Sequence, residues 1–280
     1  MADLFSRIYL KYDREIKPKL GNFPGSTRIS FFLYSLAERK IDKISKDSEP
    51  VFEKEWDNLI ILDACRFDLF KEVVNKDVES RISVGSSTLE YVEKTFSDGD
   101  YSNTVYVSGN PHFHQSQFEN LTGRNVEEVF HSVFHTYQTD WDEKENTILP
   151  KPIIRDAKTA ESLFGDKRLV VHFMQPHYPF VPSNLTKGGI NSKLDESSES
   201  VWRKAERGEY SREEVWRAYK SNLEYVIEDI MDLVENLEGR TLVTSDHGNL
   251  VGENGLYGHP SRAQAKALRK VPFLFYGDDN

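Results

Sequence analysis

Four short apolar segments, each followed at once by polar residues, restrict the fold of this chain more than any other feature. The clearest is Asn58–Leu62, which has no charged residue and runs directly into Asp63. Unbroken apolar runs of this length are typical of parallel strands that are buried on both faces. The other three end at Ser108-Gly109-Asn110, at Gln175-Pro176-His177 and at Ser245-Asp246-His247. This pattern predicts an α/β fold in which a mostly parallel central sheet is sandwiched between helices.

The residues after these strands include groups that could form a metal site. Carboxyl ends of parallel strands meet at one edge of a sheet, where α/β proteins bind their ligands. A carboxylate directly after a fully apolar strand needs a cation, a capping role or water, because burying it unpaired is costly. Asp63, Asp246 and His247 offer oxygen and imidazole donors that suit Zn²⁺ or Mn²⁺. Alternatively, Asp63 could cap the helix that we expect at Phe67–Val74.

Three hydroxyl residues, Ser86, Ser87 and Thr88, precede a predicted helix at Leu89–Phe96. Hydroxyls at a helix start are usually N-caps. The same place also suits a nucleophile, because the amides of a helix N-terminus stabilise a nearby anion. A metal beside such a hydroxyl would lower its pKa, so the segment fits transfer of a phosphoryl or sulfuryl group.

Histidines lie near several of the predicted strand ends. His177 stands between two prolines that restrict its loop, so it is a candidate to face a ligand, and His259 follows three glycines that rule out regular structure. His172 lies inside a predicted strand, and we expect it to be a core histidine with satisfied hydrogen bonds. His112 and His114 form an H-x-H pair that could bind metal, although their aromatic neighbours are equally consistent with surface stacking.

The remaining segments are predicted to be scaffold. Helical spacing of apolar residues occurs at Val126–Phe134 and at Ile153–Phe164. The longest helix should begin after Ser211, where Ser211 and Glu214 match a capping box. Pro182–Tyr210 is polar and rich in charge, which is typical of a mobile insertion or lid that could select the substrate.

Composition restricts the partners and the compartment. The net charge of −10 argues against nucleic-acid binding, which requires a basic face. A single cysteine, Cys65, excludes an intramolecular disulfide and fits a reducing compartment. We find no secretory signal and no apolar run long enough to span a bilayer, so a cytoplasmic location is expected.

Residues 1–50 should form a helical extension and linker before the main domain at 51–280. They carry ten Lys and Arg against seven Asp and Glu, unlike the acidic remainder. Apolar residues at helical spacing within 4–16 predict an amphipathic helix. Such a helix could pack on the domain or on a partner chain, which we favour, or lie on an acidic membrane surface.

Four segments taken in order resemble a known family: NLIILDACRFD, GSSTLEY, HFMQPHYPF and VTSDHGNLVGENGLYGH. They are similar to the alkaline phosphatase superfamily, and to its sulfatase-like branch with lipoteichoic acid synthases and nucleotide pyrophosphatases/phosphodiesterases. The resemblance covers about residues 55–277 and implies an alkaline phosphatase-like fold. It implies a divalent metal, Zn or Mn, held by Asp63, Thr88, Asp246 and His247. It further implies that Thr88 is the nucleophile and that His177 and His259 contact the anionic group or hold a second metal.

Departures from the family pattern limit this transfer. The chain lacks the C/S-x-P-S/A-R signature from which sulfatases make formylglycine, and Cys65 lies at the metal strand instead of the nucleophile loop. Two-metal members carry an Asp where this chain has Phe173, so one metal site is expected and a second is left open. Glu90 replaces the family's usual proline after the nucleophile, which leaves Ser86 and Ser87 open as alternatives to Thr88.

The sequence therefore predicts a metal-dependent hydrolase or transferase that acts on a small anionic phosphate ester, with glycan-linked esters among the candidates. The mechanism would pass through a covalent phospho-threonine at Thr88. One alternative is a sulfatase that uses the same hydroxyl and metal on sulfate esters. Another is a binding protein that keeps the fold without turnover.

Overall fold

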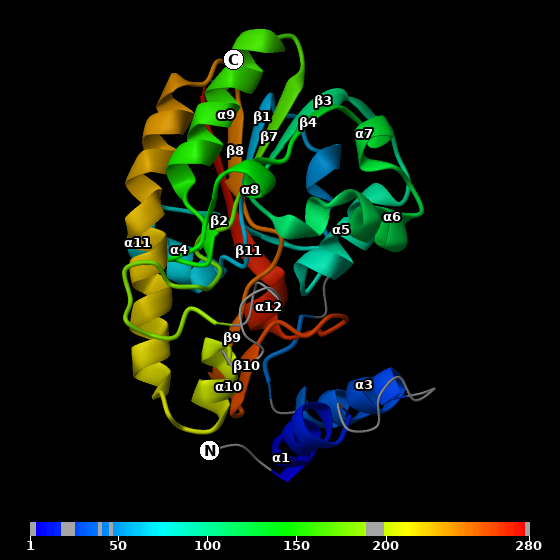
Figure 1. Ribbon diagram of the computed structural model, residues 1–280, viewed down its shortest axis with the longest axis vertical. Helices are drawn as coiled ribbons and strands as arrows, with labels where there is room; N and C mark the ends of the chain where they lie inside the picture. The colour runs from blue at the N-terminus through cyan, green and yellow to red at the C-terminus, as the bar shows by residue number, and fades with distance from the viewer. Residues whose placement is uncertain (1–3, 18–25, 39–40, 45–46, 189–198, 278–280) are drawn as a thin grey trace.

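A seven-stranded sheet with helices on both faces forms the centre of the protein (Figure 1). The computed structural model describes residues 4–17, 26–38, 41–44, 47–188 and 199–277. The sheet has the order β2-β11-β8-β1-β7-β3-β4. Its strands are β1 (Asn58–Leu62), β2 (Glu79–Ile82), β3 (Tyr101–Ser108), β4 (Phe130–Phe134), β7 (Arg168–Phe173), β8 (Thr241–Thr244) and β11 (Lys270–Tyr276). Two small two-stranded sheets pair β5 (Trp141–Asp142) with β6 (Thr147–Ile148) and β9 (Leu250–Glu253) with β10 (Leu256–Gly258).

The helices fall between these strands along the chain. The α-helices are α1 (Leu4–Lys11), α3 (Ser26–Ala37), α4 (Phe67–Val74), α5 (Thr88–Phe96), α6 (Gln115–Thr122), α7 (Val126–Val129), α8 (Thr136–Thr139), α9 (Pro150–Leu163), α10 (Val201–Glu206), α11 (Arg212–Asn236) and α12 (Lys266–Arg269). Shorter helical turns are η1 (Tyr12–Ile16), η3 (Val51–Glu53) and η4 (Pro111–Phe113).

The sheet is mostly parallel, as predicted. Strands β8, β1, β7, β3 and β4 run in one direction, and β11 is antiparallel to both β8 and β2. Leu62 is the register partner of Phe173, and Ile61 is the partner of both His172 and Thr244. The ends of β1, β7 and β8 therefore lie at one level, and the residues that follow them meet at one edge of the sheet.

Alternation along each strand divides the core into two layers. Ile60 and Leu62 of β1 pack into the cluster that contains residues of α4, α9 and α11. Leu59 and Ile61 face the opposite way, into the cluster with residues of α5, α6 and α7. Figure 1 shows α4, α9 and α11 on one side of the sheet and α5, α6 and α7 on the other. Because all five residues of β1 are buried, this strand has no polar face, and its continuous apolar sequence follows from that.

One predicted helix is wrong. We expected a helix at Val126–Phe134, but the helix ends at Val129 and Phe130–Phe134 is the edge strand β4. In this strand Val133 is the register partner of Tyr106 in β3. Aromatic and β-branched residues within 130–134 suit a strand, and pairing with β3 decides between two periodicities that are ambiguous in so short a segment.

The long helix α11 begins as predicted. The Ser211 side chain accepts the Glu214 N–H, and the Glu214 carboxylate accepts the Ser211 N–H, which forms the expected capping box. Residues 189–198 of the expected lid at Pro182–Tyr210 lie outside the described residues. Its described end contains α10.

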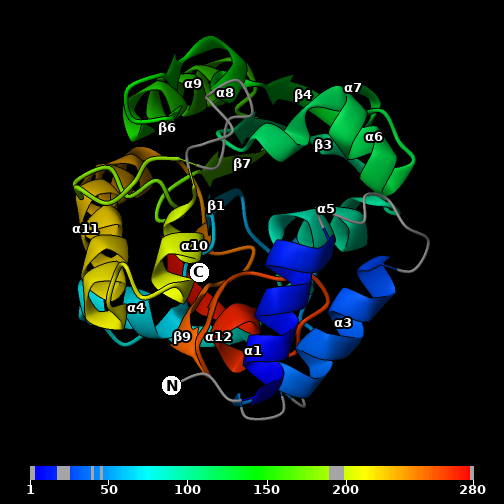
Figure 2. The same ribbon diagram turned by 60° about the horizontal axis from the view of Figure 1, so that its bottom comes forward.

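The N-terminal helices pack beside the loops that follow β8. Figures 1 and 2 show α1 and α3 side by side. Tyr9 and Tyr34 form an edge-to-face ring pair with centroids 5.2 Å apart. Both join an apolar cluster with Leu250, Leu256 and Leu268. The helical extension therefore contacts the carboxyl-edge loops of the sheet, and the division at residue 50 stays a prediction.

Candidate metal and catalytic site

The loops after β1 and β8 bring two carboxylates together at the carboxyl edge of the sheet. Asp63 and Asp246 are buried, and one ligand atom of each lies within 4.8 Å of the other and of a His172 ring nitrogen. Asp246 Oδ1 accepts N–H bonds from Ala64 (3.0 Å) and His247 (2.8 Å). These bonds fix one oxygen of Asp246 and hold the two strand ends against each other.

The pair is electrostatically incomplete without a cation. Burial, and then the charge of Asp246, raise the pKa of Asp63 well above its ordinary value. Burial also opposes ionisation of Asp246, but the imidazoles of His247 and His172 and the Ala64 N–H together lower its pKa. Asp63 Oδ1 and His172 Nε2 are buried without a hydrogen-bond partner among the described residues. Oxygen and nitrogen donors left in this state fit a divalent metal.

Thr88 is the hydroxyl that reaches this cluster. Its Oγ1 donates to Asp246 Oδ2 at 2.9 Å and lies 3.1 Å from His247 Nε2. Thr88 is the first residue of α5, so its hydroxyl lies near the amides that begin this helix. His247 Nδ1 lies 2.8 Å from the Gly248 carbonyl, which can only accept. The His247 proton is therefore on Nδ1, and Nε2 is left as an acceptor or metal ligand.

The two serines before Thr88 have structural partners instead. Ser87 caps α5, accepting the Glu90 N–H, and its Oγ lies 2.6 Å from Ser261 Oγ. Ser86 Oγ donates to Glu90 Oε2 (2.8 Å) and accepts the Ala263 N–H at 3.0 Å. Of the three hydroxyls, only that of Thr88 has hydrogen bonds to the carboxylate cluster among the described residues.

His177 and His259 lie next to the cluster. The His259 ring is 4.6 Å from the His247 ring and 5.1 Å from the His177 ring, measured between centroids. Burial lowers the pKa of His177 to about 3 and that of His259 well below its ordinary value. His177 Nδ1 lies 2.5 Å from the Tyr178 carbonyl, so Nδ1 carries the proton. The structure thus places one neutral imidazole, His259, beside His247 and a second, His177, beside His259.

His172 is not the satisfied core histidine that we expected. Its Nδ1 pairs with the Tyr106 hydroxyl at 2.9 Å, but its Nε2 lies 3.9 Å from Asp63 Oδ2 without a hydrogen-bond partner among the described residues. His172 comes one residue before the end of β7, beside the strand that leads to Asp63. Its position near the end of a strand was the signal in the sequence that could have placed it beside Asp63.

The structure also gives the positions of the helix-cap candidate Asp63, the His112–His114 pair and Cys65. Asp63 does not cap α4, whose N-cap is Arg66 without a side-chain cap bond. His114 caps α6, whereas His112 is half-buried; burial, partly offset by the charge of Asp246, lowers its pKa. Cys65 is buried, and burial raises the pKa of its thiol well above its ordinary value, so it is not an activated nucleophile.

Several contacts that support the cluster were not predicted from the sequence. Arg81, fully buried on β2, donates to Thr244 Oγ1 (2.9 Å) and to the Ser245 carbonyl (2.7 Å) and so fixes the residue before Asp246. Asn110 donates to Asp63 Oδ2. Glu90 accepts N–H bonds from Ser86 (2.9 Å) and Arg262 (2.8 Å), which ties the start of α5 to the loop after His259.

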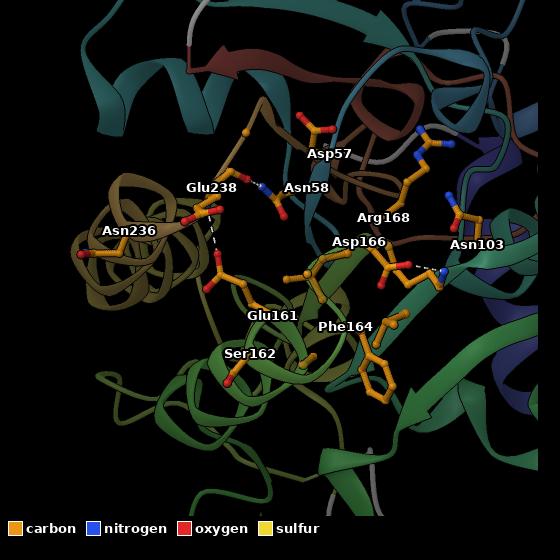
Figure 3. Close-up of a pocket in the computed structure, with 16 residues that line it drawn as sticks. Asp57, Asn58, Asn103, Glu161, Ser162, Phe164, Asp166, Arg168, Asn236 and Glu238 are labelled. Carbon is orange, nitrogen blue, oxygen red and sulfur yellow. Dashed lines mark hydrogen bonds and ion pairs between the residues drawn. The ribbon is translucent and has the colours of Figure 1, made fainter.

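A cavity of about 690 Å³ lies at the other edge of the sheet. It opens beside Asn58 and Arg168, the first residues of β1 and β7, with Glu161 and Glu238 among its lining residues (Figure 3). Glu161 accepts the Glu238 N–H at 3.0 Å, so that carboxylate has a partner. Because α/β proteins bind ligands at the carboxyl ends of parallel strands, the candidate site is the Asp63–Asp246 cluster and not this cavity.

The fold and its carboxyl-edge cluster define an alkaline phosphatase-like protein. The chain belongs to the sulfatase family, whose profile matches residues 97–280. This match includes His177, Asp246, His247 and His259, whereas Asp63 and Thr88 precede it. A search of curated proteins found no match.

Solved structures share the fold at low sequence identity. The integral membrane protein lipooligosaccharide phosphoethanolamine transferase A (EptA) from Neisseria meningitidis matches with a TM-score of 0.53 and 13% identity, over 96% of this chain and 58% of that one. The chain thus spans little more than half of that protein. The soluble domain of the same transferase matches with a TM-score of 0.52 and 14% identity, over 78% of this chain and 75% of that one. Lipoteichoic acid synthase LtaP from Listeria monocytogenes gives 0.42 and 12%, over 86% and 70%.

None of the described helices is both long enough and apolar enough to cross a membrane.

Proposed function

We propose that this protein is a metal-dependent enzyme that hydrolyses or transfers a phosphate ester, with Thr88 as its nucleophile. The observation that carries the proposal is the position of Thr88 Oγ1, at the start of α5 and within hydrogen-bond distance of Asp246 and His247. The name of the EptA structure adds an example of phosphate-ester transfer on the same fold.

The donor set supports one divalent metal, Zn or Mn. Asp63, Thr88, Asp246 and His247 would hold it, and His172 Nε2 would be a further ligand. When bound, the ion would supply positive charge for the anionic ester and would lower the pKa of the Thr88 hydroxyl. Two observations favour this assignment. The carboxylate pair is buried, and Asp63 Oδ1 and His172 Nε2 have no hydrogen-bond partner among the described residues.

The protein's own residues account for the remaining roles. Asp246 Oδ2 accepts the Thr88 hydroxyl hydrogen bond, so it is placed to receive that proton as Oγ1 attacks phosphorus. The bond from phosphorus to the leaving oxygen breaks, and the phosphoryl group is then carried by Thr88. His177 and His259 are neutral, and each uses Nδ1 to donate to an oxygen, of Tyr178 and of Asn249. Their Nε2 atoms are therefore suited to accept a hydrogen bond from the incoming water or acceptor hydroxyl. Water or an acceptor hydroxyl then releases the phosphoryl group.

A phosphate ester is preferred to a sulfate ester because the nucleophile is a threonine. Sulfatases of the formylglycine type oxidise Cys or Ser, and Thr88 lies outside any such signature. Ser86 and Ser87 have structural partners, and Cys65 is buried in the loop after β1.

The test compares Thr88→Ala with Ser87→Ala on a panel of phosphate monoesters, phosphate diesters and sulfate esters. Thr88→Ala should lower kcat by several orders of magnitude, because it removes the attacking atom, while metal content stays near the wild-type level. Rapid-quench mass spectrometry of the wild type should find phosphate on the peptide that contains residues 82–94.

Ser87→Ala is the matched control, since it removes a cap bond next to the nucleophile and should keep most of the activity. Normal turnover by Thr88→Ala would reject the proposed nucleophile. Preferential turnover of sulfate esters would establish the sulfatase alternative, and no turnover of any ester by metal-loaded protein would favour a binding protein.

A further inference from the structure

The exposed apolar side chains of this protein are concentrated on its N-terminal helices. Among the described residues, six of the eight exposed large hydrophobic side chains belong to residues 4–32, and the other two are Leu163 and Tyr225. The six are Leu4, Phe5, Ile8, Ile16, Ile29 and Phe32. Leu4 is 67% exposed and Phe32 is 62% exposed, so these side chains lie far from any packed interior.

These helices also have an apolar face that is already buried. Tyr9 of α1 and Tyr34 of α3 pack against each other and against Leu250 and Leu256. The two helices therefore expose large apolar side chains in addition to those that they bury. A surface helix normally buries its apolar stripe and presents polar residues to solvent. Large apolar side chains left exposed beside that stripe indicate a second apolar contact.

Charge distinguishes the surface that could cover this face. Residues 1–50 carry ten Lys and Arg against seven Asp and Glu, whereas the rest of the chain carries 26 against 39. Arg7 and Lys11 are exposed on α1, and helical spacing places them along one flank of Leu4 and Ile8. Apolar residues flanked by basic ones are typical of helices that lie in the interface of an anionic bilayer. The apolar side chains would enter the acyl boundary, and the basic side chains would reach the lipid phosphates.

We infer that α1 and α3 form a docking surface for an anionic lipid bilayer. The surface consists of Leu4, Phe5, Ile8, Ile29 and Phe32, with Arg7 and Lys11 at its edge. The acidic body disfavours an anionic membrane elsewhere on the molecule. The same helices pack against the segment between Leu250 and Leu268, which includes His259, so docking would place the catalytic loops close to the bilayer. The inference concerns binding alone and does not depend on the proposed chemistry.

Vesicle flotation of the full chain tests the inference. Wild-type protein should float with vesicles of phosphatidylcholine and phosphatidylglycerol, and much less with phosphatidylcholine alone. Leu4→Glu and Phe32→Glu should each lower the partition coefficient at least about tenfold, because loss of one inserted apolar side chain removes that much binding. Lys11→Glu should weaken binding at low salt and have less effect at high salt.

The matched control is Leu163→Glu. Leu163 is 64% exposed, close to the 67% of Leu4, but it lies on α9. It should leave flotation unchanged. The inference is overturned if wild-type protein fails to float with anionic vesicles at low salt, or if Leu163→Glu weakens binding as much as Leu4→Glu. It is also overturned if light scattering shows a dimer that Leu4→Glu dissociates and the wild-type protein does not bind vesicles. A second copy of the chain then covers the surface.

Discussion

His172 decides how many protein ligands the proposed metal has. Its Nδ1 is occupied by Tyr106, and its Nε2 lies beside Asp63. Burial, as the main cause, lowers its pKa to about 4, so the ring is neutral at pH 7 and can donate a lone pair to a cation.

We expect the double variant Tyr106→Phe/His172→Phe to bind Zn²⁺ or Mn²⁺ about 10- to 100-fold more weakly, the range typical of lost ligand or outer-shell support. Changing both residues avoids leaving the Tyr106 hydroxyl buried without a partner. Competition with a fluorescent chelator measures the affinity. Tyr106→Phe alone retains Nε2 but removes its outer-shell partner, so it should bind metal more weakly than the wild type and more tightly than the double variant. Equal affinity of all three proteins would make His172 purely structural.

The sequence was sufficient for those site residues that follow an apolar run directly. Asp63, Asp246 and His247 could be named because a charged residue at the end of a buried strand needs a specific partner. Thr88 could be placed at a helix start, but its separation from Ser86 and Ser87 required the hydrogen bonds to Asp246 and His247. His172 and Arg81 were missed, because a polar residue within a buried strand gives no sign of which neighbour it meets.

At the scale of single elements, the start of α5 is tied to the loop after His259 by polar contacts. Ser86 donates to the Pro260 carbonyl at 2.9 Å, Ser87 pairs with Ser261, and Glu90 accepts the Arg262 N–H. Glu90 is buried, and burial raises its pKa, but Lys94, Ser86 and Arg262 outweigh that effect and lower it. These contacts fix the segment that carries Thr88 against the segment that follows His259, although the two are distant in the sequence.

The contact between α8 and α9 predicts a pH-dependent loss of stability. Arg155 on α9 donates to both oxygens of Asp140, each at 2.9 Å, and this ion pair lowers the pKa of Asp140 to about 2. The unfolded pKa is about 3.9, so the contribution is complete above about pH 4 and is lost as the pH falls towards 2. Because the pair is largely exposed, we expect Asp140→Asn to lower the free energy of unfolding by about 0.5 kcal/mol at pH 6.

Urea unfolding of both proteins between pH 6 and pH 1.5 measures this difference, which should shrink towards zero below pH 2. The Arg155→Met variant should show the same profile, because it removes the other partner. A difference that persists at pH 1.5 would assign the effect to packing of Asp140 and not to its charge.

Strands were predicted well where both faces are buried and poorly at the edges of the sheet. β1, β7 and β8 are mostly apolar and buried, and short apolar runs of this kind are typical of strands covered on both faces. β2 at Glu79–Ile82 was missed because three of its four residues are polar, and β4 was assigned to a helix. Both are edge strands, and their pairing with β11 and β3 depends on contacts that local periodicity does not contain.

For the whole molecule, the buried carboxylate pair predicts that metal stabilises the fold. Asp63 and Asp246 repel each other in a buried site, and a bound divalent ion would remove that repulsion. At a metal concentration about 100-fold above Kd, the stabilisation is about 2.7 kcal/mol. For a chain of this size that corresponds to a rise in Tm of about 5 to 10 °C.

Calorimetry of chelated and reloaded protein checks this value. Zn²⁺ or Mn²⁺ should restore the Tm that chelation lowers, and Asp246→Asn should abolish the response. Titration should give about one equivalent per chain, since the described residues form one such cluster. An unchanged Tm after complete removal of metal would contradict the proposed cation site.

The position of β8 in the sheet has a consequence for synthesis of the protein. β8 is inserted between β1 and β11, and Asp246 and His247 follow it immediately. A nascent chain that ends before Thr241 therefore has β1 with one unpaired edge, and it lacks half of the expected metal ligands. The Ser87–Ser261 contact joins residues 174 positions apart, so the loop before α5 also acquires this contact only when the late segment has been made. Topology thus delays completion of the proposed site until the ribosome has released the strands that complete the sheet.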